Sequence, residues 1–123
     1  PVAFPFARGS GGMISTALDY AIFCQMLLNE GIYNGARILE EGSVELLTSP
    51  KIRTGTNSSY GYGFNIDGGV YGHSGSDGTR AWIDPHRELI VLVFTQTPGA
   101  GREGGNPWER FRDLINLSIN NPQ

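Results

Sequence analysis

Residues 70–94 read VYGHSGSDGTRAWIDPHRELIVLVF, and this stretch decides the fold. Val70–Ser74 and residues 79–83 each contain β-branched and aromatic side chains, and small polar residues and glycines separate them, which predicts two strands joined by a turn. Asp84-Pro85-His86 predicts the next turn. Residues 88–96 then carry a continuous apolar run, which is typical of a strand covered on both faces.

Two helices are predicted upstream of this stretch. Thr16 is placed to cap the first helix, and Asp19 stands three residues later, where a capping box has its acid. Glu41–Thr48 fit a second, short helix, which Pro50 ends. Asn34-Gly35 predicts a turn between the two helices.

The remaining elements surround the same strands. Residues 60–64 alternate aromatic residues with glycine and predict a further strand, and Gly68-Gly69 suits a tight hairpin turn after it. A last helix is predicted from Asn106, with an apolar face that includes Trp108 and Phe111 and that we expect to pack on one face of the sheet. The order predicts an α+β fold, with an antiparallel sheet of about three or four strands flanked by helices.

Composition excludes several classes of protein. The chain has 123 residues, 39% of them hydrophobic and 17% charged, and its net charge is −3 without a basic stripe, so we expect no nucleic-acid partner. Cys24 is the only cysteine and therefore forms no internal disulfide. No apolar run reaches the roughly 18 residues that a membrane span needs. No cofactor motif is present, and the sequence does not specify a compartment.

Residues 72–79 read GHSGSDGT and contain a histidine, two serines and an aspartate, side chains that can take part in catalysis. One interpretation is a glycine-rich hairpin with polar turn residues. A second is a nucleophile elbow, which needs Gly-x-Ser-x-Gly on a strand-to-helix turn; Ser76 occupies the last glycine position and a strand follows, so both requirements fail. A third is an edge-strand wall of an acyl-transfer site, where a backbone N–H stabilises a developing oxyanion.

Several segments resemble, in the same order, those of serine β-lactamase-like hydrolases. This family includes class C β-lactamases, low-molecular-weight penicillin-binding peptidases and carboxylesterases. The segments are residues 9–20 (GSGGMISTALDY), 34–39 (NGARIL), 44–48 (VELLT), 62–64 (YGF), 72–75 (GHSG) and 81–85 (AWIDP). The resemblance covers nearly the whole chain and implies an incomplete part of a β-lactamase/transpeptidase-like fold, whose sheet continues into strands from a missing N-terminal part.

The resemblance also implies roles for four consecutive residues. The family's third active-site motif is a Lys-Thr-Gly triplet on an edge strand, and His73-Ser74-Gly75 occupies the matching place. The backbone N–H after that triplet is half of the family's oxyanion hole, which implies that Ser76 is the donor here. His73 would contact the substrate or the tyrosine of the second motif, and Ser74 and Gly75 would contact the substrate. Since neutral imidazole lacks the charge of lysine, we expect weak activity on β-lactams.

The other two family motifs are absent from this sequence. Lys51 is the only lysine and no Ser-x-x-Lys surrounds it, and nothing matches Tyr-x-Asn. Ser118-Ile119-Asn120 matches the variant Ser-x-Asn but lies in the predicted terminal helix. The resemblance therefore implies that residues 1–123 are the C-terminal portion of a β-lactamase-like domain whose nucleophile lies elsewhere. Whether this chain is itself an enzyme stays open.

Two functional hypotheses follow. The first is a portion of a serine hydrolase that acts through an acyl-enzyme on a small ester, amide or β-lactam and is inactive alone. The second is a non-catalytic binding or regulatory module on the same scaffold. Because an uncovered apolar strand edge tends to pair with another chain, we expect a homo-oligomer. Asp84, His86 and Glu88 could be drawn as metal ligands, but the Asp-Pro pair favours a turn, and no metal site is predicted.

Overall fold

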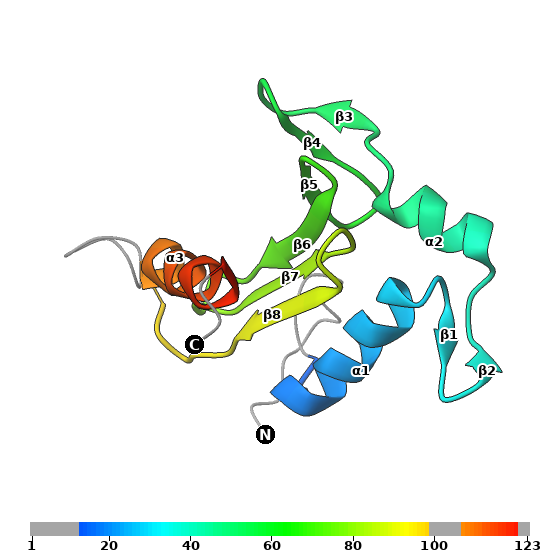
Figure 1. The fold of residues 1–123 in the computed structure, drawn as a ribbon, viewed down its shortest axis with the longest axis horizontal. Helices are drawn as coiled ribbons and strands as arrows, with labels where there is room; N and C mark the ends of the chain where they lie inside the picture. Colours follow the sequence, from blue (N-terminus) through cyan, green and yellow to red (C-terminus); the bar gives the residue numbers. More distant parts are fainter. Residues whose placement is uncertain (1–12, 99–106, 121–123) are drawn as a thin grey trace, which may run out of the picture.

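A six-stranded antiparallel sheet forms the centre of the fold (Figure 1). The structure is a computed structural model, which describes residues 13–98 and 107–120. Each strand pairs with the next one along the chain, without crossovers. The strands are β3 (Ile52–Arg53), β4 (Ser58–Tyr60), β5 (Asn65–Asp67), β6 (Val70–Ser74), β7 (Arg80–Asp84) and β8 (Leu89–Val93). With three helices, this arrangement confirms the α+β class and the antiparallel sheet.

The sheet is larger than the three or four strands expected from the sequence, because it includes the short strands β3 and β4. The strand predicted over residues 60–64 was wrong: β4 ends at Tyr60, and β5 begins at Asn65. The backbone N–H of Gly61 donates to the carbonyl of Phe64 over 2.8 Å, which closes a turn. Gly63 has a φ of 92°, a conformation that glycine adopts without strain.

The predicted helices upstream of the sheet are confirmed. In α1 (Ala17–Leu28), the hydroxyl oxygen of Thr16 accepts a hydrogen bond from the backbone N–H of Asp19 over 3.1 Å, as an N-cap does. The second helix, α2, spans Glu41–Thr48. Asn34-Gly35 forms the turn of a small hairpin between them, made of β1 (Ile32–Tyr33) and β2 (Ala36–Arg37).

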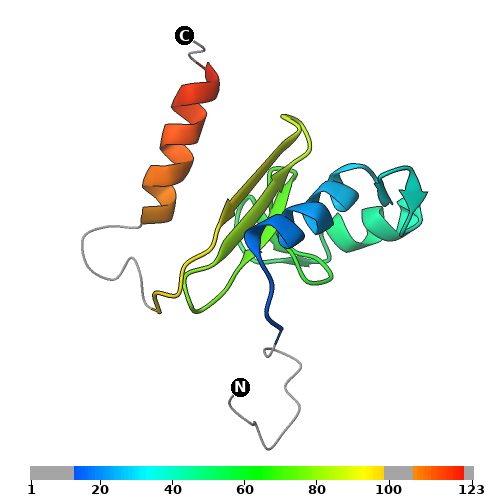
Figure 2. The ribbon, with the colours of Figure 1, turned by 90° about the horizontal axis from the view of Figure 1, so that it is seen from below.

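Helices lie on both faces of the sheet (Figure 2), with α1 and α2 on one side and α3 (Pro107–Asn120) on the other. The core lies between the sheet and α1 and α2, and its most deeply buried side chains are Cys24, Leu27 and Ile83. On the opposite face, the ring of Trp108 stacks on that of Trp82 with centroids 6.3 Å apart, as expected for this residue of the last helix. Phe111, also expected to pack on the sheet, is 40% exposed, and its ring lies against that of Trp108. Asn106, the expected cap of that helix, lies outside the described residues.

The apolar run in β8 is explained by this layered arrangement. Ile90 and Leu92 pack against the core on the α1 side. Leu89 and Val91 line a cavity under α3 on the other side. The prediction of a strand covered on both faces is therefore confirmed. Within the described part of the chain, β8 is also an edge strand, since it pairs only with β7.

Candidate functional site

The predicted site residues lie at the C-terminal end of β6 and in the turn after it. Residues 70–72 of β6 pair with β5 on one side, and Tyr71 and Gly72 also pair with β7 on the other. Among the residues that the structure describes, His73 and Ser74 pair with β7 alone, opposite Ala81 and Arg80. The expectation of an edge strand therefore needs correction, because β6 is an interior strand. Within the described residues only its last two residues form an open edge, since β5 begins at Asn65, opposite Gly72.

The turn from β6 to β7 is braced by backbone hydrogen bonds. The N–H of Gly75 donates to the carbonyl of Thr79 over 2.9 Å, and the N–H of Gly78 donates to the carbonyl of Gly75 over 3.2 Å. The N–H of Thr97 donates to the carbonyl of Asp77 over 2.9 Å, which ties the turn to the segment after β8. These bonds fix the turn as part of the sheet and give it a defined geometry.

Ser76 sits at the tip of this braced turn and is exposed. Among residues 13–98 and 107–120, no backbone carbonyl accepts a hydrogen bond from the N–H of Ser76. The side chains of Ser76 and Ser74 likewise make no hydrogen bond within that described part. The turn therefore leaves one backbone donor and two hydroxyls available to a bound molecule, which is the kind of wall that stabilises a developing oxyanion.

His73 is exposed, but both nitrogens of its ring are engaged. Nδ1 lies 2.8 Å from the carbonyl oxygen of Ser74, and Nε2 lies 3.1 Å from the hydroxyl oxygen of Tyr60. The ring of Tyr60 meets the imidazole edge-on, with centroids 5.8 Å apart. Sequence analysis missed Tyr60 because it lies on β4, separated from β6 by β5, and only the tertiary structure brings the two side chains together.

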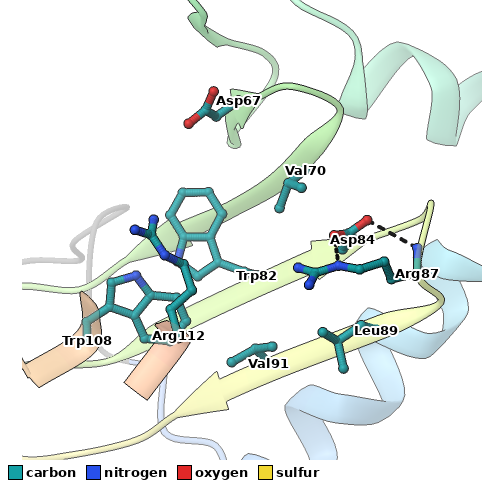
Figure 3. A pocket seen from close by; sticks show the side chains of 9 residues that line it. All are labelled: Asp67, Val70, Trp82, Asp84, Arg87, Leu89, Val91, Trp108 and Arg112. Carbon is teal, nitrogen blue, oxygen red and sulfur yellow. Dashed lines mark hydrogen bonds and ion pairs between the residues drawn. The ribbon is translucent and has the colours of Figure 1, made fainter. Parts of the chain in front are cut away.

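A separate cavity of about 160 Å³ lies on the opposite face, between the sheet and α3 (Figure 3). None of its lining residues belongs to the turn from His73 to Thr79. The lining residues come from β5 to β8, from the turn before β8 and from α3: Asp67, Val70, Trp82, Asp84, Arg87, Leu89, Val91, Trp108 and Arg112. The cavity is therefore separate from the predicted site residues His73 to Ser76.

Asp84 is the buried acid beside this cavity, and it serves the turn before β8. Its carboxylate accepts hydrogen bonds from the backbone N–H of His86 over 3.0 Å and from the Nε of Arg87 over 2.6 Å. Burial alone would raise the pKa of Asp84, but the hydrogen bonds and charge of Arg87 outweigh it and hold the pKa below its usual value. The predicted turn is confirmed, and this carboxylate is already committed to it.

The part of the chain that the structure describes has neither a metal-binding cluster nor a membrane-spanning helix. No three acidic, histidine or cysteine side chains within it gather closely enough to hold a metal ion. No helix within it combines the length and the apolar character that crossing a membrane requires.

Comparison with known proteins identifies the family to which this chain belongs. Residues 1–113 match the family described as Beta-lactamase. An N-acetylmuramyl-L-alanine amidase from Bacillus subtilis is 31% identical over 98 residues, which are 71% of this chain and 22% of the relative. A protein of Salmonella paratyphi B named "Putative D-alanyl-D-alanine carboxypeptidase" is 25% identical over 73% of this chain and 23% of its own length.

A solved structure is similar in fold. A penicillin-binding protein homologue from Caulobacter crescentus superposes with a TM-score of 0.52 at 20% identity, over 62% of this chain and 24% of that one. The chain thus spans less than a quarter of the length of the relatives it matches. The Gly-rich segment of residues 9–12, part of the resemblance, lies outside the described residues.

Proposed function

Because this chain belongs to the beta-lactamase family of hydrolases, we propose that it is the C-terminal portion of a serine hydrolase domain and supplies one wall of its active site. The reaction is acyl transfer to water. A serine hydroxyl from outside residues 1–123 attacks the substrate carbonyl, the amine or alcohol departs with a proton, and water then hydrolyses the acyl-enzyme. The chain has neither the Ser-x-x-Lys nor the Tyr-x-Asn motif that this chemistry uses in the family.

The open end of β6 is the observation that carries the proposal. It presents the N–H of Ser76, which has no backbone acceptor within residues 13–98 and 107–120, on a turn that hydrogen bonds hold in place. The donor therefore needs no rearrangement when negative charge develops on the substrate oxygen. One such preorganised donor typically contributes about 3 kcal/mol to transition-state stabilisation. In this assignment Ser76 stabilises the oxyanion through its backbone.

The neighbouring residues bind the substrate in the same assignment. Gly75 contacts the substrate through its exposed backbone, since the place of a side chain there is taken by the hydroxyl of Thr79. The hydroxyl of Ser74 has no partner within the described residues and is available to the substrate. His73 is assigned to the same wall of the active site, because it directly precedes Ser74 and Gly75 in the sequence. No cofactor is needed for this chemistry, because the serine and water supply both nucleophiles.

The names of the two relatives guide the choice of substrate. Both names describe enzymes that cleave amide bonds. We take a small molecule with an amide bond as the first substrate class to test in the full-length protein, ahead of esters and β-lactams. His73 in place of a lysine makes β-lactams the least favoured of the three, since many of them carry a carboxylate that a lysine would bind.

Turnover by the purified 123-residue chain tests whether the nucleophile lies elsewhere. We expect no hydrolysis of nitrocefin, of a p-nitrophenyl ester or of an amide substrate above the buffer rate, and turnover by the full-length protein that contains the chain. Turnover by the chain alone that Ser74→Ala abolishes would contradict the proposal, because it would place the nucleophile within the turn. No turnover by the full-length protein would favour a binding module instead.

The edge of β8 leads to a second proposal, about association. Leu89–Val93 are all apolar, and β7 pairs with only one side of this strand within the described residues. An apolar edge of this kind favours pairing with another chain, so we propose that the isolated chain forms a homo-oligomer through β8. Size-exclusion chromatography with light scattering measures this directly, and a strict monomer at high concentration would contradict it.

A further inference from the structure

Tyr60 contacts His73 from a well-held position on the neighbouring part of the sheet. Tyr60 is held in the interior of the sheet, since β4 pairs with both β3 and β5. Its carbonyl also accepts a hydrogen bond from the backbone N–H of Lys51 over 3.0 Å. From this rigid position the hydroxyl reaches past the start of β5 to Nε2 of His73, 3.1 Å away. A polar group on a rigid strand is well suited to orient a neighbour.

The two partners of the imidazole determine where its proton lies. The carbonyl oxygen of Ser74 can only accept a hydrogen bond, so the Nδ1 atom 2.8 Å from it carries the hydrogen. In the neutral ring Nε2 is then an acceptor, and the hydroxyl of Tyr60 must be the donor. An unrestrained neutral imidazole favours the opposite tautomer, with the hydrogen on Nε2. The surroundings of His73 therefore select the less common form.

We propose that Tyr60 is a positioning residue that holds His73 as its neutral, Nδ1-protonated tautomer, with the ring locked against the open edge of β6. This inference rests on the function proposed above for its relevance to catalysis, but the geometry stands without it. The consequence is that neutral His73 has no free N–H to offer a substrate. The donors that face a substrate from this wall are then the backbone of Ser76 and the hydroxyl of Ser74, and His73 acts by orienting the Ser74 carbonyl.

Nuclear magnetic resonance on the 123-residue chain tests the proposal without any need for turnover. Long-range proton–nitrogen correlation in histidine-labelled protein, above the titration of imidazole, reports which ring nitrogen carries hydrogen. We expect the hydrogen of His73 on Nδ1 in the wild type. Tyr60→Phe removes only the hydroxyl, and we expect it to shift His73 towards the Nε2-protonated form.

The chain supplies matched controls for this experiment. Tyr62→Phe removes a hydroxyl from a neighbouring exposed tyrosine that makes neither a hydrogen bond nor a ring contact with His73, and we expect no change of tautomer. His86, the other histidine, reports whether either variant disturbs the fold. An Nε2-protonated His73 in the wild type, or a Tyr60→Phe variant that keeps the wild-type tautomer, would overturn the proposal. An inactive full-length protein would contradict the proposed function and leave this result unaffected.

Discussion

The two halves of β6 differ sharply, although they are consecutive in the sequence. Tyr71 and Gly72 are buried, with β5 and β7 paired on either side. His73 is exposed and Ser74 half-buried, and of the described strands only β7 pairs with them. The first half obtains its geometry from the core, whereas the second half is an open edge held by a braced turn. A single strand thus carries rigid support at one end and free hydrogen-bonding groups at the other.

This difference explains how one wall of a site can be exposed to substrate and still have a fixed geometry. The N–H of Ser76 donates to no backbone carbonyl in the described part of the chain, so its position must come from its neighbours. Those neighbours are the Gly75–Thr79 hydrogen bond and the buried start of β6. Substitutions in the buried half of β6 should therefore lower stability, whereas substitutions at its open end should affect binding.

Gly72→Ala should have the largest effect on stability. A Cβ at Gly72 would overlap the carbonyl oxygen of Ala81 and lie 2.9 Å from the Cα of Trp82, and these backbone atoms cannot move without breaking the β6–β7 pairing. We expect a loss of at least about 4 kcal/mol in the free energy of unfolding, measured by denaturant titration.

Gly75→Ala and Gly42→Ala are the matched comparisons. A Cβ at Gly75 would meet the hydroxyl of Thr79, which is a flexible side chain, and a Cβ at Gly42 in α2 would meet nothing. We expect a smaller loss at Gly75 and little change or a gain at Gly42. Equal losses at Gly72 and Gly75 would contradict the proposed division of β6.

The substitutions Tyr71→Ala and His73→Ala each remove a side chain from one half of β6, and their effects on stability can be compared. Tyr71 is 4% exposed and its ring meets that of Phe64 with centroids 5.6 Å apart. Its truncation should cost about 3 kcal/mol or more of stability, as for other large core residues. His73 is exposed, and its truncation should cost less than about 1 kcal/mol. Thermal unfolding of the two variants gives the comparison, and a larger cost at His73 would refute it.

High pH should destabilise the fold, because the core contains two groups that must stay protonated, Cys24 and Tyr71. Burial raises the pKa of Cys24 to about 11, and burial, with a contribution from Cys24, raises the pKa of Tyr71 to about 12. In the unfolded chain these groups ionise near their ordinary pKa values of about 8.5 and 10. Above those values the unfolded state binds fewer protons than the folded state, so stability falls as pH rises.

The slope of this fall is measurable. Each group contributes up to about 1.4 kcal/mol per pH unit between its two pKa values. Urea titrations from pH 8 to 11 should show the decline, and Cys24→Ala should make the early part of it shallower. Stability that stays constant over this range, or an unchanged slope in Cys24→Ala, would mean that Cys24 is not the buried neutral thiol described above.

Much of this fold could be predicted because its signals are local. The Thr16 cap, the Glu41–Thr48 helix and the Val70–Ser74 strand each follow from residue types within a few positions, and the structure has the same elements. The extent of the sheet could not be predicted, because β3 has two residues and Ile52 in it is 67% exposed, so no alternating pattern marks it.

Two features of the site depended on contacts that sequence patterns do not contain. The aromatic–glycine alternation of residues 60–64 has the period of a strand, yet the N–H of Gly61 closes a turn on the carbonyl of Phe64. Gly61 is buried so close to the carbonyls of Leu47 and Ser49 that a Cβ would not fit. The pairing of Tyr60 with His73 links residues 13 positions apart across a third strand. The roles of His73 to Ser76, at the end of β6 and in the turn after it, came from the resemblance, and they stay a prediction.

The most direct test of the central claim is the rate of hydrolysis by the full-length protein with Ser76→Pro, compared with Ser76→Ala. Proline removes the backbone N–H, whereas alanine removes the hydroxyl and keeps that N–H. If Ser76 stabilises the oxyanion through its backbone, Ser76→Pro should lower kcat about 100-fold to 1000-fold, and Ser76→Ala should stay close to the wild-type rate. A folded Ser76→Pro protein with wild-type kcat, or an equal loss in Ser76→Ala, would contradict the account.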